Sequence, residues 1–132
     1  MIGLDTGVLL RYLTGDDPKL SPRAAKLLED RTKDSPVFIS LVTLAEAVRT
    51  LQGPGFEFTR DQVLHAVGAL ASLNEVRLQE PDVVRAALAT ARSTGAAFEQ
   101  ALVATLGKAA GCSHTATFDQ AAAAAIPDFS PV

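Results

Sequence analysis

The chain has 132 residues, of which 48% are hydrophobic and 20% are charged, and this balance excludes an intrinsically disordered protein. This length predicts a single domain, residues 1–132, with a core of its own. The formal net charge of −3 argues against a general nucleic-acid coat, although an enzyme that contacts a few phosphates remains compatible with it.

The sequence shows no pattern typical of a targeting signal or of an internal disulfide. No apolar run approaches the roughly 18 residues that a membrane span needs. The N-terminus lacks a basic lead-in and carries Asp5 inside its apolar stretch, so it does not read as a signal peptide. Cys112 is the only cysteine and has no partner for an internal disulfide. We therefore expect a cytoplasmic protein without a membrane partner.

The first half of the chain alternates short apolar segments with amphipathic ones. Residues 1–5 predict a strand, and 6–14 predict a short helix that ends near Gly15. Ser21 followed by Pro22 predicts an N-cap and first helical residue, with the helix reaching about Lys33. Further along, the pattern predicts a strand over 36–40 and a helix over 42–52.

The same alternation continues after the stop at residues 53–55. Thr59 is the expected cap of a helix that reaches residue 73. The remaining expected elements are a strand over 75–78, helices over 81–93 and 97–110, a strand over 113–118, a short helix from about 120, and a small strand over 128–130. Strands that alternate with helices predict parallel pairing in a layered α/β sandwich.

Isolated acids recur within apolar segments of this pattern. Asp5 and Asp119 each follow a predicted strand, and Glu46 lies in the helix that follows another. In parallel α/β sheets, sites form where the carboxyl ends of strands meet helix starts. Taken singly, each acid is explained as well by a helix cap or a solvated residue as by a functional site. Taken together, and without clustered His or Cys, they predict a site for Mg²⁺ or Mn²⁺.

Several motifs carry a resemblance to a known family. The opening run Leu4-Asp5-Thr6-Gly7-Val8-Leu9-Leu10-Arg11-Tyr12-Leu13, then Val42-Thr43-Leu44-Ala45-Glu46, then Thr117-Phe118-Asp119, occur in the order and spacing of PIN-domain proteins. The chain resembles in particular the VapC toxins of bacterial toxin–antitoxin pairs. The resemblance implies a three-layer α/β/α sandwich with a central parallel sheet. It also implies a Mg²⁺-dependent endoribonuclease, a cognate antitoxin and a homodimer.

The resemblance also assigns residues. Asp5, Glu46 and Asp119 correspond to site acids, and Thr117 to a hydroxyl that lines the site. We expect Asp5 and Asp119 to ligate the metal directly, and Glu46 to bind it through water or to accept a proton. Arg11 and Arg49 lie within about one helical turn of Asp5 and Glu46, where they would contact phosphate or form surface ion pairs.

Two positions depart from the family pattern. Gly7 stands where the family usually has Asn, which is expected to loosen the turn after Asp5. Gln100 stands where the family has a further site aspartate, and Ala97 where it often has an earlier one. A glutamine oxygen can ligate Mg²⁺ without charge, so we expect weaker metal binding. The neighbouring Glu99 either compensates as a ligand or is an acid favoured by the helix dipole.

Other functions were weighed against this interpretation. Gln100 favours a PIN-like module that has lost catalysis and only binds RNA or a protein. Asp5-Thr6-Gly7 also matches retroviral-type aspartic proteases, but those are nearly all β and this chain is rich in predicted helices. His65 is expected to be exposed, His114 to be a packed or edge strand residue, and Cys112 to be small and buried.

Overall fold

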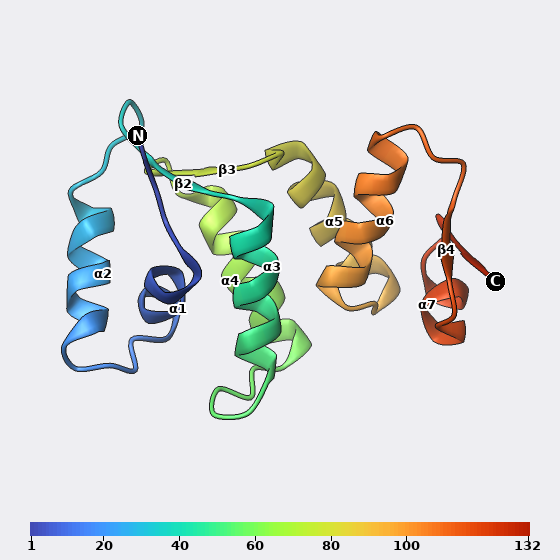
Figure 1. Cartoon of the computed structure of the whole chain (residues 1–132), viewed down its shortest axis with the longest axis horizontal. Helices are drawn as coiled ribbons and strands as arrows, with labels where there is room; N and C mark the ends of the chain where they lie inside the picture. The colour runs from blue at the N-terminus through green and yellow to red at the C-terminus, as the bar shows by residue number, and fades with distance from the viewer. The chain divides into compact units, whose positions relative to one another are not determined.

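One or two helices follow each strand except the last in the computed structural model, which describes all 132 residues (Figure 1). The helices are α1 (Thr6–Thr14), α2 (Leu20–Glu29), α3 (Leu41–Gln52), α4 (Arg60–Ser72), α5 (Pro81–Thr94), α6 (Phe98–Ala109) and α7 (Gln120–Ala125). The strands are β1 (Ile2–Gly3), β2 (Val37–Ile39), β3 (Val76–Leu78), β4 (Thr115–Thr117) and β5 (Phe129–Pro131). The chain divides into two units, Met1–Pro81 and Asp82–Val132.

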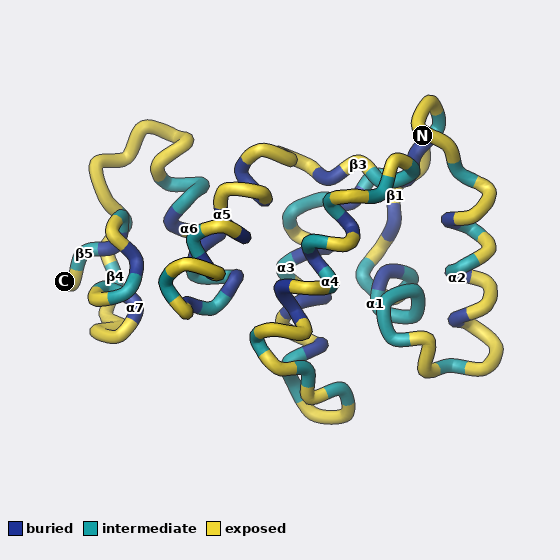
Figure 2. The backbone as a smooth tube through the Cα atoms, turned by 180° about the vertical axis from the view of Figure 1, so that it is seen from behind, coloured by how far each residue is buried: buried dark blue, intermediate teal, exposed yellow.

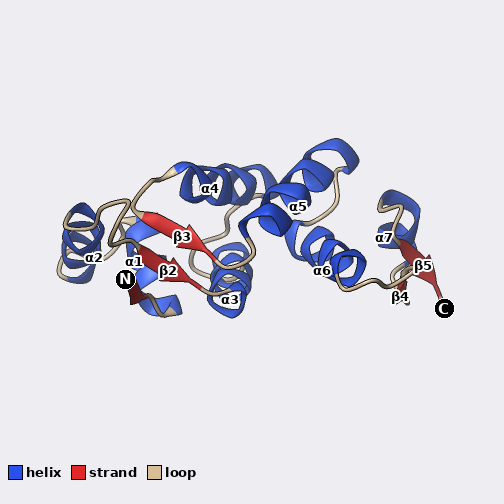
Figure 3. Cartoon of the chain, turned by 90° about the horizontal axis from the view of Figure 1, so that it is seen from above, coloured by secondary structure: helices blue, strands red, loops and turns tan.

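A parallel sheet of order β1-β2-β3 organises the first unit (Figure 3). Ile2 stands opposite Val37, and Val37 opposite Val76. The backbone N–H of Leu4 donates to the carbonyl of Phe38 at 2.9 Å, which prolongs the pairing of the first strand up to Asp5. The sheet therefore ends where the first acid stands, as the sequence predicts.

The core of the first unit combines strand residues with one face of each neighbouring helix. Along α3 and α4, buried and exposed positions alternate with the period of a helix (Figure 2). Its fully buried side chains include Leu9, Val37, Ile39, Leu44, Val48, Leu51, Val63, Val67 and Leu70. Burial of such a Leu or Ile stabilises the fold by about 1.5–3 kcal/mol each.

Side-chain caps begin three helices of this unit where the sequence predicts a start. Asp5 caps α1 and Ser40 caps α3, and Thr59 with Gln62 forms a capping box on α4. The predicted start at Ser21 is wrong, because α2 begins at Leu20 and ends at Glu29 rather than Lys33. The Asp17 carboxylate accepts the N–H groups of Lys19 and Leu20 instead, at 2.9 and 2.7 Å.

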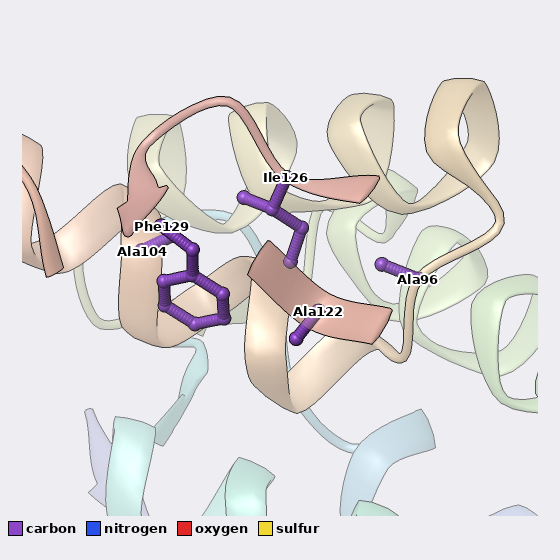
Figure 4. Close-up of a cluster of buried hydrophobic side chains, with 5 residues drawn as sticks. All are labelled: Ala96, Ala104, Ala122, Ile126 and Phe129. Carbon is purple, nitrogen blue, oxygen red and sulfur yellow. The ribbon is translucent and has the colours of Figure 1, made fainter. Parts of the chain in front are cut away.

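The second unit pairs β4 with β5 in parallel across α7, with Thr115 opposite Phe129. A small apolar cluster holds its segments together, and Figure 4 shows Ile126 and Phe129 against small side chains of α6 and α7. Its members are Ala96, Ala104, Ala122, Ile126 and Phe129. Parallel pairing in both units confirms the predicted α/β class.

Candidate active site

Asp5 stands at the junction of β1 and α1. Its Oδ1 accepts the N–H of Val8 at 3.0 Å, which caps the helix, and its backbone is extended (φ −89°, ψ 172°). Leu4 and Leu9 on either side are buried, so the junction is fixed while the carboxylate itself is exposed. Oδ2 accepts no hydrogen bond from the protein. Asp5 therefore presents one carboxylate oxygen outward.

Glu46 of α3 is tied to the residue after Asp5. The hydroxyl of Thr6 donates to Glu46 Oε2 at 2.7 Å. The hydroxyl of Thr43, which lies one turn earlier on α3, is 3.4 Å from the carbonyl oxygen of Leu4 at the end of the first strand. These two contacts place the predicted acids Asp5 and Glu46 in one region of the first unit. Thr6 was not predicted as a site residue, although a hydroxyl directly after the acid was the available signal.

Gly7 does not loosen the turn after Asp5, contrary to expectation. It lies in the first turn of α1, and the Asp5 cap is intact. A Cβ at this position would lie 3.6 Å from Asp5 Oδ1, an ordinary van der Waals contact. The turn would therefore accept a larger residue, and glycine is not required for it.

The two predicted phosphate-binding arginines differ in their surroundings. Arg11 Nη1 lies 3.0 and 2.9 Å from the two carboxylate oxygens of Asp16. The Thr14 hydroxyl and Arg11 together hold the pKa of Asp16 below its ordinary value. Arg11 thus forms the surface ion pair that was its alternative, although such a pair is weak enough to exchange for a phosphate. Arg49 is exposed and has no ion-pair partner.

Asp119 occupies the equivalent strand-to-helix junction of the second unit. Its Oδ1 accepts the N–H of Ala122 at 2.9 Å and so caps α7, and its own N–H donates to Thr117 Oγ1 at 3.0 Å. The Gln100 side-chain amide donates to the remaining oxygen, Oδ2, at 2.9 Å. The N–H of Ala122 and then the Gln100 amide lower the pKa of Asp119, so the carboxylate is ionised at neutral pH.

Small residues bring Gln100 to Asp119. Ala96, which precedes α6, and Ala104 on α6 each lie four positions from Gln100 and belong to the apolar cluster, as does Ala122, three positions after Asp119 (Figure 4). At the far end of α6, a Cβ on Gly107 would lie 2.6 Å from Thr115 Oγ1, so a larger residue would force the Thr115 side chain or β4 to shift. Alanine and glycine at these positions allow α6 to approach the β4–α7 junction closely.

Glu99 has an unusual environment for a first-turn acid. Its Oε1 is buried and has no hydrogen-bond partner. A buried carboxylate oxygen without a partner is costly unless a cation or donor reaches it. The solvated, dipole-favoured alternative does not describe this oxygen, whereas a role for Glu99 as a ligand stays a prediction.

The oxygen donors of the predicted acids are of the kind that a hard divalent cation prefers. However, no three Asp, Glu, His or Cys side chains lie close enough together to hold a metal ion. The available donors are the carboxylates of Asp5 and Glu46 in one unit and those of Glu99 and Asp119 in the other. Mg²⁺ and Mn²⁺ prefer oxygen ligands of this type, and the unpartnered Oε1 of Glu99 and free Oδ2 of Asp5 are of the right chemistry.

The histidines and the cysteine take no part in this arrangement. His65 is exposed on α4, as expected. His114 precedes β4 rather than lying within it and is exposed beside Ser113, so its prediction as a packed or edge strand residue is wrong. Cys112 is exposed, not buried, because it lies in the turn after the end of α6. The backbone N–H of Cys112 donates to the carbonyl of Gly107 there.

Comparison with known proteins identifies the family. The family model of the PIN domain matches residues 2–126, a range that reaches into both units and contains every predicted site residue. No curated protein matches the chain significantly. None of the helices is long and apolar enough to cross a membrane. PIN domains have an α/β/α fold and are generally metal-dependent nucleases that act on nucleic acids. With nearly its whole length matched, the chain belongs to the PIN domain family.

Proposed function

We propose that this chain is a Mg²⁺-dependent endoribonuclease of the VapC toxin type, which hydrolyses RNA phosphodiester bonds and is neutralised by a cognate antitoxin. The observation that carries the proposal is a pair of exposed acids that the protein orients: Asp5 is fixed as a helix cap, and Glu46 accepts the Thr6 hydroxyl at 2.7 Å. Two oriented carboxylates at the end of a parallel strand are what a metal-dependent hydrolase requires.

The proposed nuclease function gives each of the predicted acids a role. We propose Asp5 and Asp119 as direct metal ligands, Glu46 as a ligand through water or a proton acceptor, and Glu99 as a supplementary ligand. The family model extends across both units, which supports one domain over residues 1–132. A bound Mg²⁺ or Mn²⁺ would activate water for in-line attack and stabilise the charge that develops on the phosphate.

Other side chains would serve the substrate. The Thr117 hydroxyl accepts the Asp119 N–H and so fixes the turn that carries this acid. Arg49 is an exposed cation one helical turn after Glu46, in a suitable position to contact an RNA phosphate. Arg11 would do so only after leaving Asp16.

Binding of an antitoxin is supported by a groove between α1 and α2. The groove has a volume of about 330 Å³, and its wall is mainly apolar but includes two arginines. It is lined by Gly7, Val8, Arg11, Leu20, Arg23 and Leu27. We propose that an amphipathic antitoxin segment packs here and inserts a basic side chain among the site acids.

Exposed apolar side chains support a homodimer. Val42 and Val103 are 68% and 53% exposed, so each offers apolar area that a second protomer would cover. Sedimentation should therefore detect a dimer at tens of micromolar, an order of magnitude chosen from ordinary affinities. A well-behaved monomer at that concentration contradicts the dimer but not the nuclease.

A second candidate function is a binding module without catalysis. The observation that favours it is the Gln100 amide, which occupies the Asp119 oxygen that an acid in its place would leave to a metal. Ribonuclease activity on a defined RNA, measured across a Mn²⁺ series, separates the two candidates. A weakened enzyme gains activity as Mn²⁺ rises and loses it in EDTA, whereas a pure binder retains RNA affinity and cleaves at no concentration.

The matched variants for this assay are Glu46→Gln and Glu29→Gln. Both remove one exposed carboxylate from a helix of the first unit, but only Glu46 accepts the hydrogen bond from Thr6. We expect Glu46→Gln to lose cleavage and Glu29→Gln to keep it. Equal activity in both variants would contradict the proposed role of Glu46.

A further inference from the structure

Gln100 and Asp119 form a contact that holds without a cation. The two side chains come from α6 and from the β4–α7 junction, and their polar atoms lie 2.9 Å apart. Asp119 has its other oxygen on the Ala122 N–H, so both of its oxygens accept a hydrogen bond. The carboxylate is therefore fully oriented by the protein alone.

The orientation of the amide follows from its neighbour. An ionised carboxylate only accepts hydrogen bonds, so the Gln100 NH₂ group faces Asp119 and its carbonyl oxygen faces away. To offer that oxygen to a metal bound at Asp119 Oδ2, the amide would have to turn over and lose the 2.9 Å hydrogen bond. The geometry thus favours a donor role for Gln100 over the ligand role suggested by its position in the sequence.

We propose that the Gln100 amide takes the place of a metal cation at Asp119. The amide holds the carboxylate in place without metal, and the presence of glutamine instead of an acid at this position makes divalent metal binding weak. This inference rests on the proposed nuclease function. An acid at position 100 would place two carboxylates side by side, and their repulsion would be relieved by a metal ion. Glutamine relieves it with a hydrogen bond and leaves one negative charge fewer for the ion.

Packing of the apolar cluster fixes the backbone on both sides of the contact between Gln100 and Asp119. Ala96 before α6 and Ala104 on α6, four positions to either side of Gln100, are buried in the cluster that also contains Ala122. The backbone positions of residue 100 and Asp119 are therefore set by the cluster, independently of the amide. A substitution at residue 100 changes the chemistry at Asp119 while the surrounding core stays in place.

Gln100→Glu is the sharpest test because it is isosteric and exchanges the NH₂ donor for a charged oxygen. In EDTA this variant should melt at a lower Tm than the parent. By calorimetry it should bind Mn²⁺ about 10–100-fold more tightly than the parent does. Added Mn²⁺ should also raise its Tm more than it raises that of the parent. Gln100→Met lacks both polar atoms of the amide and should also lower the metal-free Tm. Its affinity for Mn²⁺ should remain well below that of Gln100→Glu.

Two further proteins make every outcome decisive. Gln52→Glu adds the same charge on α3, where Gln52 makes no hydrogen bond to an acid, and should bind Mn²⁺ like the parent. If Gln100→Glu binds like the parent while Asp5→Asn abolishes binding, the inference is overturned and the nuclease proposal stands. If none of the proteins, including Gln100→Glu, binds Mn²⁺, both are overturned. An unchanged metal-free Tm in Gln100→Met also overturns the inference.

Discussion

Asp5 has two functions that can be separated by substitution, because its two carboxylate oxygens have different partners. Oδ1 caps α1 through the N–H of Val8 at 3.0 Å, and Oδ2 is available to a metal. Asparagine retains an acceptor oxygen and is as good an N-cap as aspartate, but it lacks the charge. Alanine loses the cap and the charge together. Asp5→Asn therefore tests the chemistry, and Asp5→Ala adds the structural loss.

The expected magnitudes follow from these contacts. Loss of an N-cap destabilises a protein by about 0.5–2 kcal/mol. At about 3–5 °C per kcal/mol for a chain of this length, Asp5→Ala should lower Tm by about 2–10 °C. Asp5→Asn loses an attraction to the helix dipole of about 0.3–1 kcal/mol, which relief of repulsion towards Glu46 offsets. Its Tm should thus equal or exceed that of the parent, although both variants lose at least about 100-fold in activity.

The assay combines thermal unfolding with cleavage of a defined RNA in Mg²⁺. Thr59→Ala is the matched control, since it removes the Oγ1 acceptor 3.2 Å from the Gln62 N–H and so uncaps α4 away from the acids. It should lower Tm like Asp5→Ala and leave cleavage unchanged. Full activity in purified Asp5→Asn, free of contaminating nuclease, would refute the metal-site reasoning.

The remaining predictions concern the surroundings of the acids. Thr6→Val removes the 2.7 Å hydrogen bond to Glu46, so kcat/KM should fall while Tm changes little; unchanged kcat/KM would mean that Glu46 needs no orientation. Because the folded-state pKa of Asp119 lies below its ordinary 3.8, its stabilising contribution is present above that pH and is lost as pH falls further. Gln100→Met should raise this pKa and move acid unfolding to higher pH, as carboxyl NMR titration would detect. Phe118 is 85% exposed beside Asp119, so Phe118→Ala should weaken RNA binding by about 1–3 kcal/mol if a base stacks there, and equal affinity by anisotropy would exclude stacking.

The alternation of strands and helices was predictable because its signals are local. Apolar runs, the cap at Thr59 and the glycine stops act over a few residues, and each produced an element close to its expected bounds. The start of α2 was not predictable in the same way. Ser21 and Pro22 give a strong start signal, but Ser21 is buried and its hydroxyl accepts the N–H of Asp17, whose carboxylate caps the helix instead.

Contacts within the site depend on which residues distant in the sequence meet, and a single sequence does not contain that information. The hydrogen bond from Thr6 to Glu46 joins residues 40 positions apart, and that from Gln100 to Asp119 joins residues 19 apart. Motif order identified the acids, but not the groups that orient them. The exposed Cys112 was missed for a similar reason, since its small apolar character says nothing about a turn that faces solvent.

Helix capping and metal binding were considered as alternative explanations for each acid, and the structure makes them compatible. At Asp5 and at Asp119, one oxygen accepts the N–H three residues later, at 3.0 and 2.9 Å. That bond fixes the rotamer, so the second oxygen points in a defined direction at no further entropic cost. At Asp5 this oxygen is free, whereas at Asp119 it accepts the Gln100 amide. Capping is thus the means by which each acid is oriented. The residue at position 100 determines how much negative charge surrounds Asp119.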